Sequence, residues 1–321
     1  MVWLRIAAAY LGVLVLALTI NFALPRLAPG DPLSFLLPED VLAEMSEADQ
    51  MRVLAEFGLD QPVPVQFAAY AAGVVTGDLG ISLTYGAPVW DVVIGRLPWT
   101  LLLMGWALAL SALLGTALGV MAARFRGGFG DVSTTVVVLF LGSAPVFWIA
   151  MLLITLFSAR LGWLPSFGAV PLAAMPGSPA YYWGVAERLV MPVAALTLVQ
   201  TAGVWLTARS SMAVALARDY VTFAHAKGVP EARVFRAHAL RNAILPIYTN
   251  VMIGVGGLLG GALVVETVFS YPGIGTLIVE GVQARDYNLL QGVFLVATLS
   301  VIAANLVADL SYPLLDPRVR R

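Results

Sequence analysis

The sequence of 321 residues contains no cysteine, and its basic residues include only one lysine. Without cysteine the chain can form no disulfide, no thiolate metal site and no thiol nucleophile. The one lysine, Lys227, is followed by Gly228, whereas the phosphate-binding loop of a nucleotide site needs a lysine followed by serine or threonine. The chain therefore cannot bind a nucleotide through that motif.

Charged residues are also scarce. They make up 12% of the chain, against about 25% in an ordinary soluble domain. Hydrophobic residues reach 60% and the mean hydropathy is +0.88. This leaves too little polar surface to cover a soluble particle of this size, so we expect a membrane protein. The formal net charge of −1 excludes a polycationic nucleic-acid binder.

Long apolar runs are plentiful. Six windows have no internal charge and approach or exceed the roughly 20 residues that a membrane-spanning helix needs. They are Ile6–Leu24, Trp99–Ala123, Val132–Ala159, Leu189–Ala208, Ala243–Val265 and Tyr287–Ala308. The pattern predicts an all-α membrane protein with six transmembrane helices. An even number of spans places both termini on the same side.

The charges outside these windows divide strongly by side. The side that holds both termini carries 12 basic and 4 acidic residues, a net of +8, and the opposite side carries a net of −8. By the positive-inside rule the basic side is cytoplasmic. We therefore expect both termini in the cytoplasm.

The first window has an alternative interpretation as a signal peptide, because Arg5 precedes it and small residues follow. The apolar core of a signal peptide is usually about 7 to 15 residues long. This run is longer, so we interpret it as the first transmembrane helix.

The segment 25–98 is predicted to be a small extracytoplasmic subdomain. Within it, Ser46 followed by Asp49 is typical of a helix N-cap, and Gly58 is a typical helix end. The subdomain is either an ordinary soluble cap or a docking surface for an outer partner, and the sequence leaves both interpretations open.

The most informative polar stretch runs from Arg218 to Pro246. Gly228 is suited to end one helix, and Pro230 with Glu231 is suited to begin the next. The stretch therefore predicts two short helices with a sharp corner. In the second, one face carries Val234, Phe235, His238 and Ala239. We expect this apolar ridge to be exposed and to need a partner; an amphipathic helix on anionic lipid is the alternative.

This stretch resembles the cytoplasmic coupling loop, or EAA loop, of permease subunits of type I ABC importers. It is most similar to the first permease of the dipeptide/oligopeptide/nickel family. Thr222, Phe223 and Ala224 occupy the Glu-Ala-Ala positions, and Thr222 and Phe223 depart from that consensus. The consensus proline of Ile-x-Leu-Pro is replaced by Arg241. The resemblance implies that the ATPase-coupling residues are Thr222, Phe223, Ala224, Lys227, Gly228, Pro230, Glu231, Val234, Phe235, His238, Leu240 and Arg241.

The resemblance extends over nearly the whole chain. Its segments include 26–32, 58–62, 77–80, 265–275, 284–287 and 315–318. It implies a first transmembrane helix at 1–24, an extracytoplasmic subdomain at 25–98, a MetI-like transmembrane domain at 99–312 with its coupling loop at 209–242, and a cytoplasmic tail at 313–321.

Two other functional classes fit the residues less well. The histidines His225 and His238 each lack the adjacent glutamate of a metalloprotease helix. A proton-coupled secondary transporter normally keeps ionisable residues at mid-membrane, and the windows here have only Glu266 and Asp309 at their ends. Since no nucleotide motif is present, we expect the energy to come from a separate ATPase.

Glycine and proline mark further candidate positions. Gly256 with Gly260, and Gly257 with Gly261, form small-x-x-x-small pairs that allow close helix approach. Gly142 precedes Pro145, which should kink the third span. These residues either pack helices together within the chain, or line the translocation pathway or contact the second permease.

On the outer side, the resemblance implies a gate or a contact for the substrate-binding protein. Residues 276–284 are too few to cross a membrane and are predicted to be interfacial or re-entrant. The candidate residues are Glu266, Tyr271, Pro272, Gly273 and Asp286.

The resemblance also implies an assembly in a bacterial inner membrane. Its expected members are this multi-pass chain, a second homologous permease, two ABC ATPase subunits that bind ATP and Mg, and an extracytoplasmic substrate-binding protein. No cofactor, metal or nucleic acid is expected in this chain. Di- or oligopeptides are the first expected substrates, with nickel or another metal chelate as the alternative.

Overall fold

The computed structural model describes residues 2–27, 33, 39–56, 60–256 and 262–315. The chain divides into a first unit, residues 1–98 with 272–302, and a second unit, residues 99–271 with 303–321. Each unit is described by itself. Gly58, Gly257, Gly260 and Gly261, named above, lie outside the described residues.

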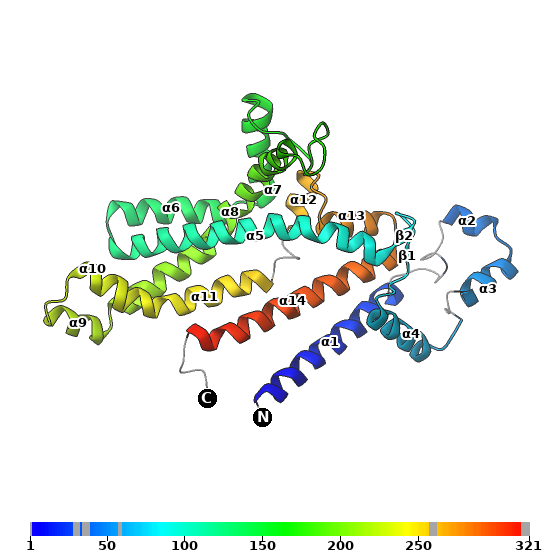
Figure 1. The fold of residues 1–321 in the computed structure, drawn as a ribbon, viewed down its shortest axis with the longest axis horizontal. Coiled ribbons are helices and arrows are strands. Elements are labelled where there is room, and N and C mark those ends of the chain that lie inside the picture. Colours follow the sequence, from blue (N-terminus) through cyan, green and yellow to red (C-terminus); the bar gives the residue numbers. More distant parts are fainter. Residues whose placement is uncertain (1, 28–32, 34–38, 57–59, 257–261, 316–321) are drawn as a thin grey trace. The chain divides into compact units, whose positions relative to one another are not determined.

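The first unit is mostly helical. Its helices and its two-stranded antiparallel sheet are shown in Figure 1. They are α1 (Val2–Leu27), α2 (Glu39–Glu44), α3 (Glu47–Glu56), α4 (Val63–Thr76), β1 (Ile81–Ser82), β2 (Ala87–Pro88), α13 (Ile274–Gln283) and most of α14 (Tyr287–Leu315). Helices α1 and α4 meet through an edge-to-face contact of Phe22 and Phe67, whose ring centroids are 5.2 Å apart.

The predicted cap at Ser46 is confirmed. The Asp49 backbone N–H donates to Ser46 Oγ at 3.2 Å, and Ser46 Oγ donates to Asp49 Oδ2 at 2.6 Å. This reciprocal pair satisfies one of the N–H groups that the first turn of α3 leaves without a helical partner.

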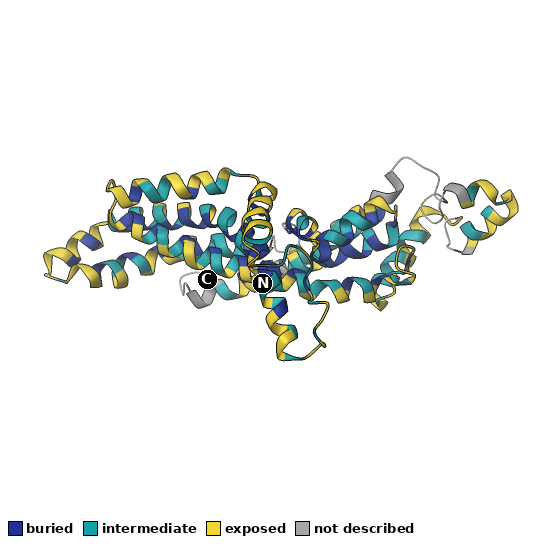
Figure 2. Cartoon of the chain, turned by 90° about the horizontal axis from the view of Figure 1, so that it is seen from above, coloured by how far each residue is buried: buried dark blue, intermediate teal, exposed yellow. Residues whose placement is uncertain are grey.

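The second unit contains most of the apolar helices. They are α5 (Val89–Arg124, which begins in the first unit), α6 (Phe129–Ser143), α7 (Val146–Leu153), the π-helix η2 (Ile154–Arg160), α8 (Pro179–Leu216), α9 (Asp219–Ala226), α10 (Glu231–Arg233), the π-helix η3 (Val234–Leu240), α11 (Arg241–Gly256) and α12 (Leu263–Val268). Helices α6 and α11 pack against α8. In Figure 2 buried residues lie on the inward faces of these helices.

Among the described residues, three helices are long and apolar enough to cross a membrane: α5, α8 and α14. A fourth span exists if α6 is taken together with α7 and η2, which are bent by 99° at their junction. The bend is at Pro145, as predicted, because proline lacks an N–H and restricts the residue before it. The chain is thus a mostly helical protein with three or four candidate spans, and the count of six stays a prediction.

Close packing of α5 on α8 organises the second unit. A Cβ added at Gly115 would lie 2.7 Å from Val204 Cβ, and one at Gly119 would lie 2.6 Å from the Trp205 carbonyl oxygen. Gly142 of α6 similarly faces Ala202 of α8. These glycines bring helix backbones together, as small residues do in membrane helix pairs.

Candidate functional site

The polar stretch after α8 folds into the predicted pair of short helices with a sharp corner. Helix α9 ends at Ala226. Gly228 follows it, with a φ of +76° in the left-handed region that favours glycine. The Val229 N–H donates to the Ala224 carbonyl at 3.2 Å and closes the corner. Pro230 then precedes α10. We call the segment from α9 to η3 the elbow.

The elbow has a small core of its own. Val221 and Ala224 of α9 pack with Val234 of η3, and all three are buried. The predicted exposed ridge is therefore wrong at Val234. Because α9 folds back across the corner, its apolar face covers this side chain.

The rest of the predicted ridge also faces inward. Ala239 is buried beside Ala123 of α5 and Met212 of α8, and Phe235 is half-buried against the same cluster. The reason is that η3 packs on the C-terminal ends of the two long helices α5 and α8. The Phe235 side of the elbow therefore contacts its own chain and is not free to form an apolar docking ridge.

The most exposed large apolar side chain of the elbow is Phe223. It is 61% exposed, and the Lys227 ammonium lies 4.4 Å from its ring centroid. Figure 2 shows the mainly exposed surface of this end of the second unit. The remaining predicted coupling residues differ in exposure. The exposed ones are Thr222, Gly228, Pro230, Glu231 and Arg241; His238 and Leu240 are half-buried, and Ala224 is buried.

Sequence reasoning did not identify the contact of α5 with the elbow. Arg124, the last residue of α5, places its guanidinium carbon 5.5 Å from the Phe235 ring centroid. Its Nη2 is 3.9 Å from Glu231 Oε1. The sequence does contain a signal for this contact, a basic residue just after an apolar window. In the sequence analysis that residue counted only toward the charge of its side of the membrane.

A second missed contact joins α6 to α8. The Arg209 guanidinium donates two hydrogen bonds to the Asp131 carboxylate, at 2.7 and 2.8 Å. The Gly127 N–H donates to the same carboxylate at 3.0 Å. Asp131 is 3% exposed. This bidentate pair is the strong kind of ion pair and fixes the α5–α6 turn to the end of α8.

The outer candidates of the second unit are buried. Glu266 is fully buried and accepts a hydrogen bond from Thr100 Oγ1 at 2.7 Å. The Tyr271 N–H donates to the Glu266 carbonyl at 2.7 Å, and the Tyr271 ring packs edge-to-face on Trp99. The turn after α12 therefore packs Glu266 and Tyr271 inside the unit. Their expected role in an outer gate or a binding-protein contact stays a prediction.

Asp286 lies in the first unit and is also fully buried. Its carboxylate accepts hydrogen bonds from Ser82 Oγ at 2.6 Å, from the Thr84 N–H at 3.0 Å and from the Leu289 N–H at 3.0 Å. Asp286 thus caps α14 and ties it to the β1–β2 hairpin. Of its neighbours on this side, Pro272 is half-buried and Gly273 is buried.

We expect Asp286→Ala to lower the free energy of unfolding by about 1–3 kcal/mol, because it leaves buried donors unsatisfied and removes a helix cap. The measurement is the unfolding midpoint of the purified chain in detergent. Asp60→Ala is the matched control, since Asp60 is exposed and should change little. Equal midpoints for the two variants would contradict the capping role.

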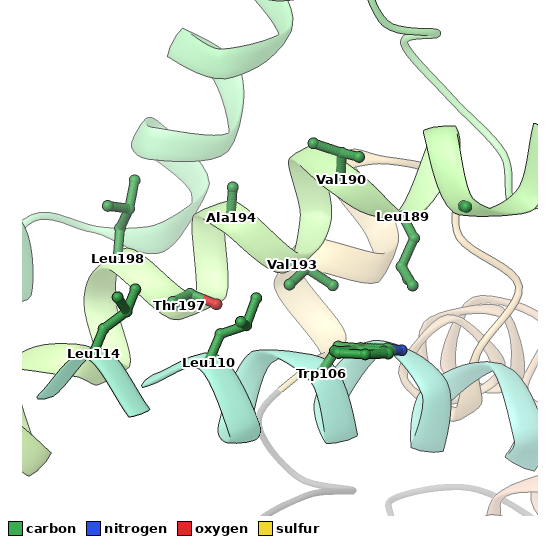
Figure 3. A pocket seen from close by; sticks show the side chains of 10 residues that line it. Trp106, Leu110, Leu114, Leu189, Val190, Val193, Ala194, Thr197 and Leu198 are labelled. Atoms are coloured by element: carbon green, nitrogen blue, oxygen red, sulfur yellow. The ribbon is translucent and has the colours of Figure 1, made fainter. Parts of the chain in front are cut away.

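An apolar groove lies between α5 and α8. It has a volume of about 430 Å³. Figure 3 shows Trp106, Leu110 and Leu114 of α5 facing α8, where Thr197 contributes a hydroxyl. With no charged group in its lining, the groove cannot neutralise a charged ligand.

The comparisons with known proteins agree with this arrangement. Residues 115–321 match the family described as binding-protein-dependent transport system inner membrane component. The chain is 36% identical to the dipeptide transport system permease protein DppB of Escherichia coli K12, over 94% of this chain and 93% of that protein. It is 37% identical to the di/tripeptide transport system permease protein DppB of Pseudomonas aeruginosa, with the same coverage.

A Brucella ovis protein described as a peptide permease is 38% identical over 96% of this chain and 95% of its own length. The family match covers more than half of the chain, and the relatives cover nearly all of it. Apolar helices, the elbow and these matches agree on a multi-pass membrane protein. The chain belongs to the family of membrane permease components of binding-protein-dependent ABC importers, which are not enzymes and work with separate ATPase and substrate-binding subunits.

Proposed function

We propose that this chain is one of two permease subunits that form the translocation pathway of an importer for di- or oligopeptides. The names of its relatives support the peptide class. The second permease is a homologous chain, two ABC ATPases bind ATP and Mg, and an extracytoplasmic protein delivers the substrate. The complex is located in a bacterial inner membrane.

The proposed topology has six spans, with both termini in the cytoplasm and residues 25–98 outside. It is supported by the division of charge, with a net of +8 on one side and −8 on the other. Residues 209–242 then lie in the cytoplasm, where an ATPase can reach them.

The elbow is the proposed ATPase docking site. The observation that carries this assignment is Phe223, an aromatic side chain that is 61% exposed on a charged, water-facing helix pair. An exposed aromatic anchor beside a cation is the composition that binding hot spots favour. Gly228 with its φ of +76° fixes the angle between α9 and η3 and so fixes the shape that the partner meets.

We expect Phe223→Asp to weaken retention of the ATPase subunits by roughly thirtyfold, as loss of a hot spot worth about 2 kcal/mol would do. ATP-dependent peptide uptake should fall with it, while the chain stays inserted. The measurement is co-purification of the ATPase at graded concentrations, with uptake into proteoliposomes of the whole complex.

Phe129→Asp is the matched control, because Phe129 is 90% exposed and belongs to α6, outside the elbow. It should keep the ATPase bound. If Phe223→Asp retains the ATPase and transports as the unaltered complex does, the elbow is not the docking site.

The substrate class needs its own test. Proteoliposomes with the complete complex should accumulate a labelled dipeptide when ATP is present, and should not accumulate nickel. A protonophore should leave dipeptide uptake intact. ATP-dependent nickel accumulation without peptide uptake would assign the alternative cargo, and uptake abolished by the protonophore would indicate proton coupling.

A further inference from the structure

The inner end of α5 touches the elbow without being covalently part of it. Helices α8 and α11 flank the elbow along the chain, so any movement of the elbow reaches them directly. Helix α5 lies more than 90 residues earlier in sequence and meets the elbow itself only through side-chain contacts. The structure shows which contacts these are.

Arg124 provides the principal polar contact. Its guanidinium carbon lies 5.5 Å from the Phe235 ring centroid and 5.4 Å from the Phe125 ring centroid. The 3.9 Å approach to Glu231 involves two exposed side chains, and such surface pairs contribute little. The Phe235 ring is half-buried, so the guanidinium–ring contact is the stronger link.

Helix α5 packs closely on α8 along its inner half. Gly115 and Gly119 hold its backbone against Thr201 and Trp205 of α8, with no space for even a methyl group. Protein interiors packed this tightly transmit displacement as a unit. A displacement applied at Arg124 is thus carried along the helix.

The other end of this part of α5 holds a buried contact. Thr100 Oγ1 donates to the Glu266 carboxylate of α12. The rise of an α-helix places Thr100 about 36 Å from Arg124, roughly the thickness of a membrane. Helix α5 therefore connects the elbow, at its Arg124 end, to α12, at its Thr100 end.

We infer that Arg124 is a positioning residue for coupling: it holds α5 to the elbow through Phe235, so that ATPase-driven movement of the elbow reaches the Thr100–Glu266 contact through α5. This inference rests on the proposed function of the elbow. It assigns to Arg124 a role in transmission and none in ATPase binding.

The first test measures the ATP hydrolysed per peptide transported by the reconstituted complex. Arg124→Met keeps side-chain length and removes the charge, and should raise this ratio about fivefold while the ATPase stays bound. Arg124→Lys keeps a cation over the ring and should stay within about twofold of the unaltered complex. Arg126→Met, at an exposed position in the same turn, is the matched control and should have no effect.

A double-mutant cycle separates the contact from general packing. If Arg124 acts through Phe235, then Phe235→Leu and Arg124→Met should each raise the ratio, and the double variant should be no worse than the more impaired single variant. Additive effects would show that the two residues act independently, and would overturn the inference.

A distance measurement tests the movement itself. Because the chain has no cysteine, spin labels attach only to cysteines that are introduced. We would introduce them as Met121→Cys on α5 and Arg236→Cys on η3. In the unaltered background the distance between the labels should stay the same with and without ATP, since α5 moves with the elbow. With Arg124→Met added, the distance should change or broaden on ATP binding.

The outcomes distinguish this inference from the proposed function. A nucleotide-dependent distance in the unaltered background, or an unchanged distance with Arg124→Met, overturns the role of Arg124. Loss of the ATPase from the Arg124→Met complex also overturns it, because it would place Arg124 in assembly. The proposed function fails by a different result: if the Phe223→Asp complex retains the ATPase, the elbow is not the docking site.

Discussion

Replacing Asp131 by leucine should lower the free energy of unfolding by about 3 kcal/mol, the lower end of the range for breaking a buried ion pair. The change removes both hydrogen bonds to Arg209 and leaves its guanidinium without its carboxylate. The lower end is expected because the Arg209 side chain remains 28% exposed and can be partly rehydrated. The measurement is SDS-induced unfolding of the purified chain.

The double variant Asp131→Leu with Arg209→Leu is the informative control. It removes the stranded charge, and replacement of a buried ion pair by apolar residues is often neutral. The double variant should therefore be more stable than Asp131→Leu alone. If it is less stable, the pair contributes through its attraction and not through the penalty of an unpaired charge.

Gly119→Val should prevent most of the chain from reaching its folded state. The added Cβ would lie 2.6 Å from the Trp205 carbonyl oxygen and 2.8 Å from Ala208 Cβ. One of these neighbours is backbone and neither can rotate away, so α5 and α8 would have to separate. Overpacking of this kind costs about 1–3 kcal/mol or more. The measurement is the yield of folded, monodisperse protein in detergent.

Gly105→Val is the matched control for this substitution. Gly105 lies in the same helix, and an added Cβ there meets no atom within 4 Å. Both variants make the same glycine-to-valine change in helix propensity, so a difference between them reports packing alone. Equal yields would show that the α5–α8 approach at Gly119 is not required for folding.

The same glycines show how far the sequence could be interpreted. Gly115 and Gly119 form a small-x-x-x-small pair within an apolar window, a signal as clear as the pairs that we emphasised in the fifth window. The sequence contains both sets and does not say which helix approaches which. Only the structure identifies α8 as the partner of the first pair.

The elbow divides in the same way. Its corner was predictable because Gly228 and Pro230 act on their own backbone, through a left-handed φ and a missing N–H. The exposure of its apolar residues was not. A helical pattern shows which residues share a face, but here Val234 and Phe235 meet α9 and α5 of the same chain, and Phe223 remains exposed.

Burial also decided the outer candidates. Glu266 and Asp286 are acidic residues beside turns, and the sequence does not show which groups their carboxylates meet. In the structure each carboxylate accepts hydrogen bonds from distant residues, Thr100 for Glu266 and Ser82 for Asp286. Such pairs are separated by more than 160 residues, and no local pattern predicts them.

The sequence alone determined that this is a helical membrane protein of a transport family and where its elbow turns. These properties depend on composition, on charge totals and on backbone preferences of single residues, which neighbours in space do not alter. The tertiary structure alone decided which residues are buried, that Arg209 pairs with Asp131, and that Arg124 joins α5 to the elbow. These contacts depend on which helix faces meet, and the packing of the whole chain selects those faces.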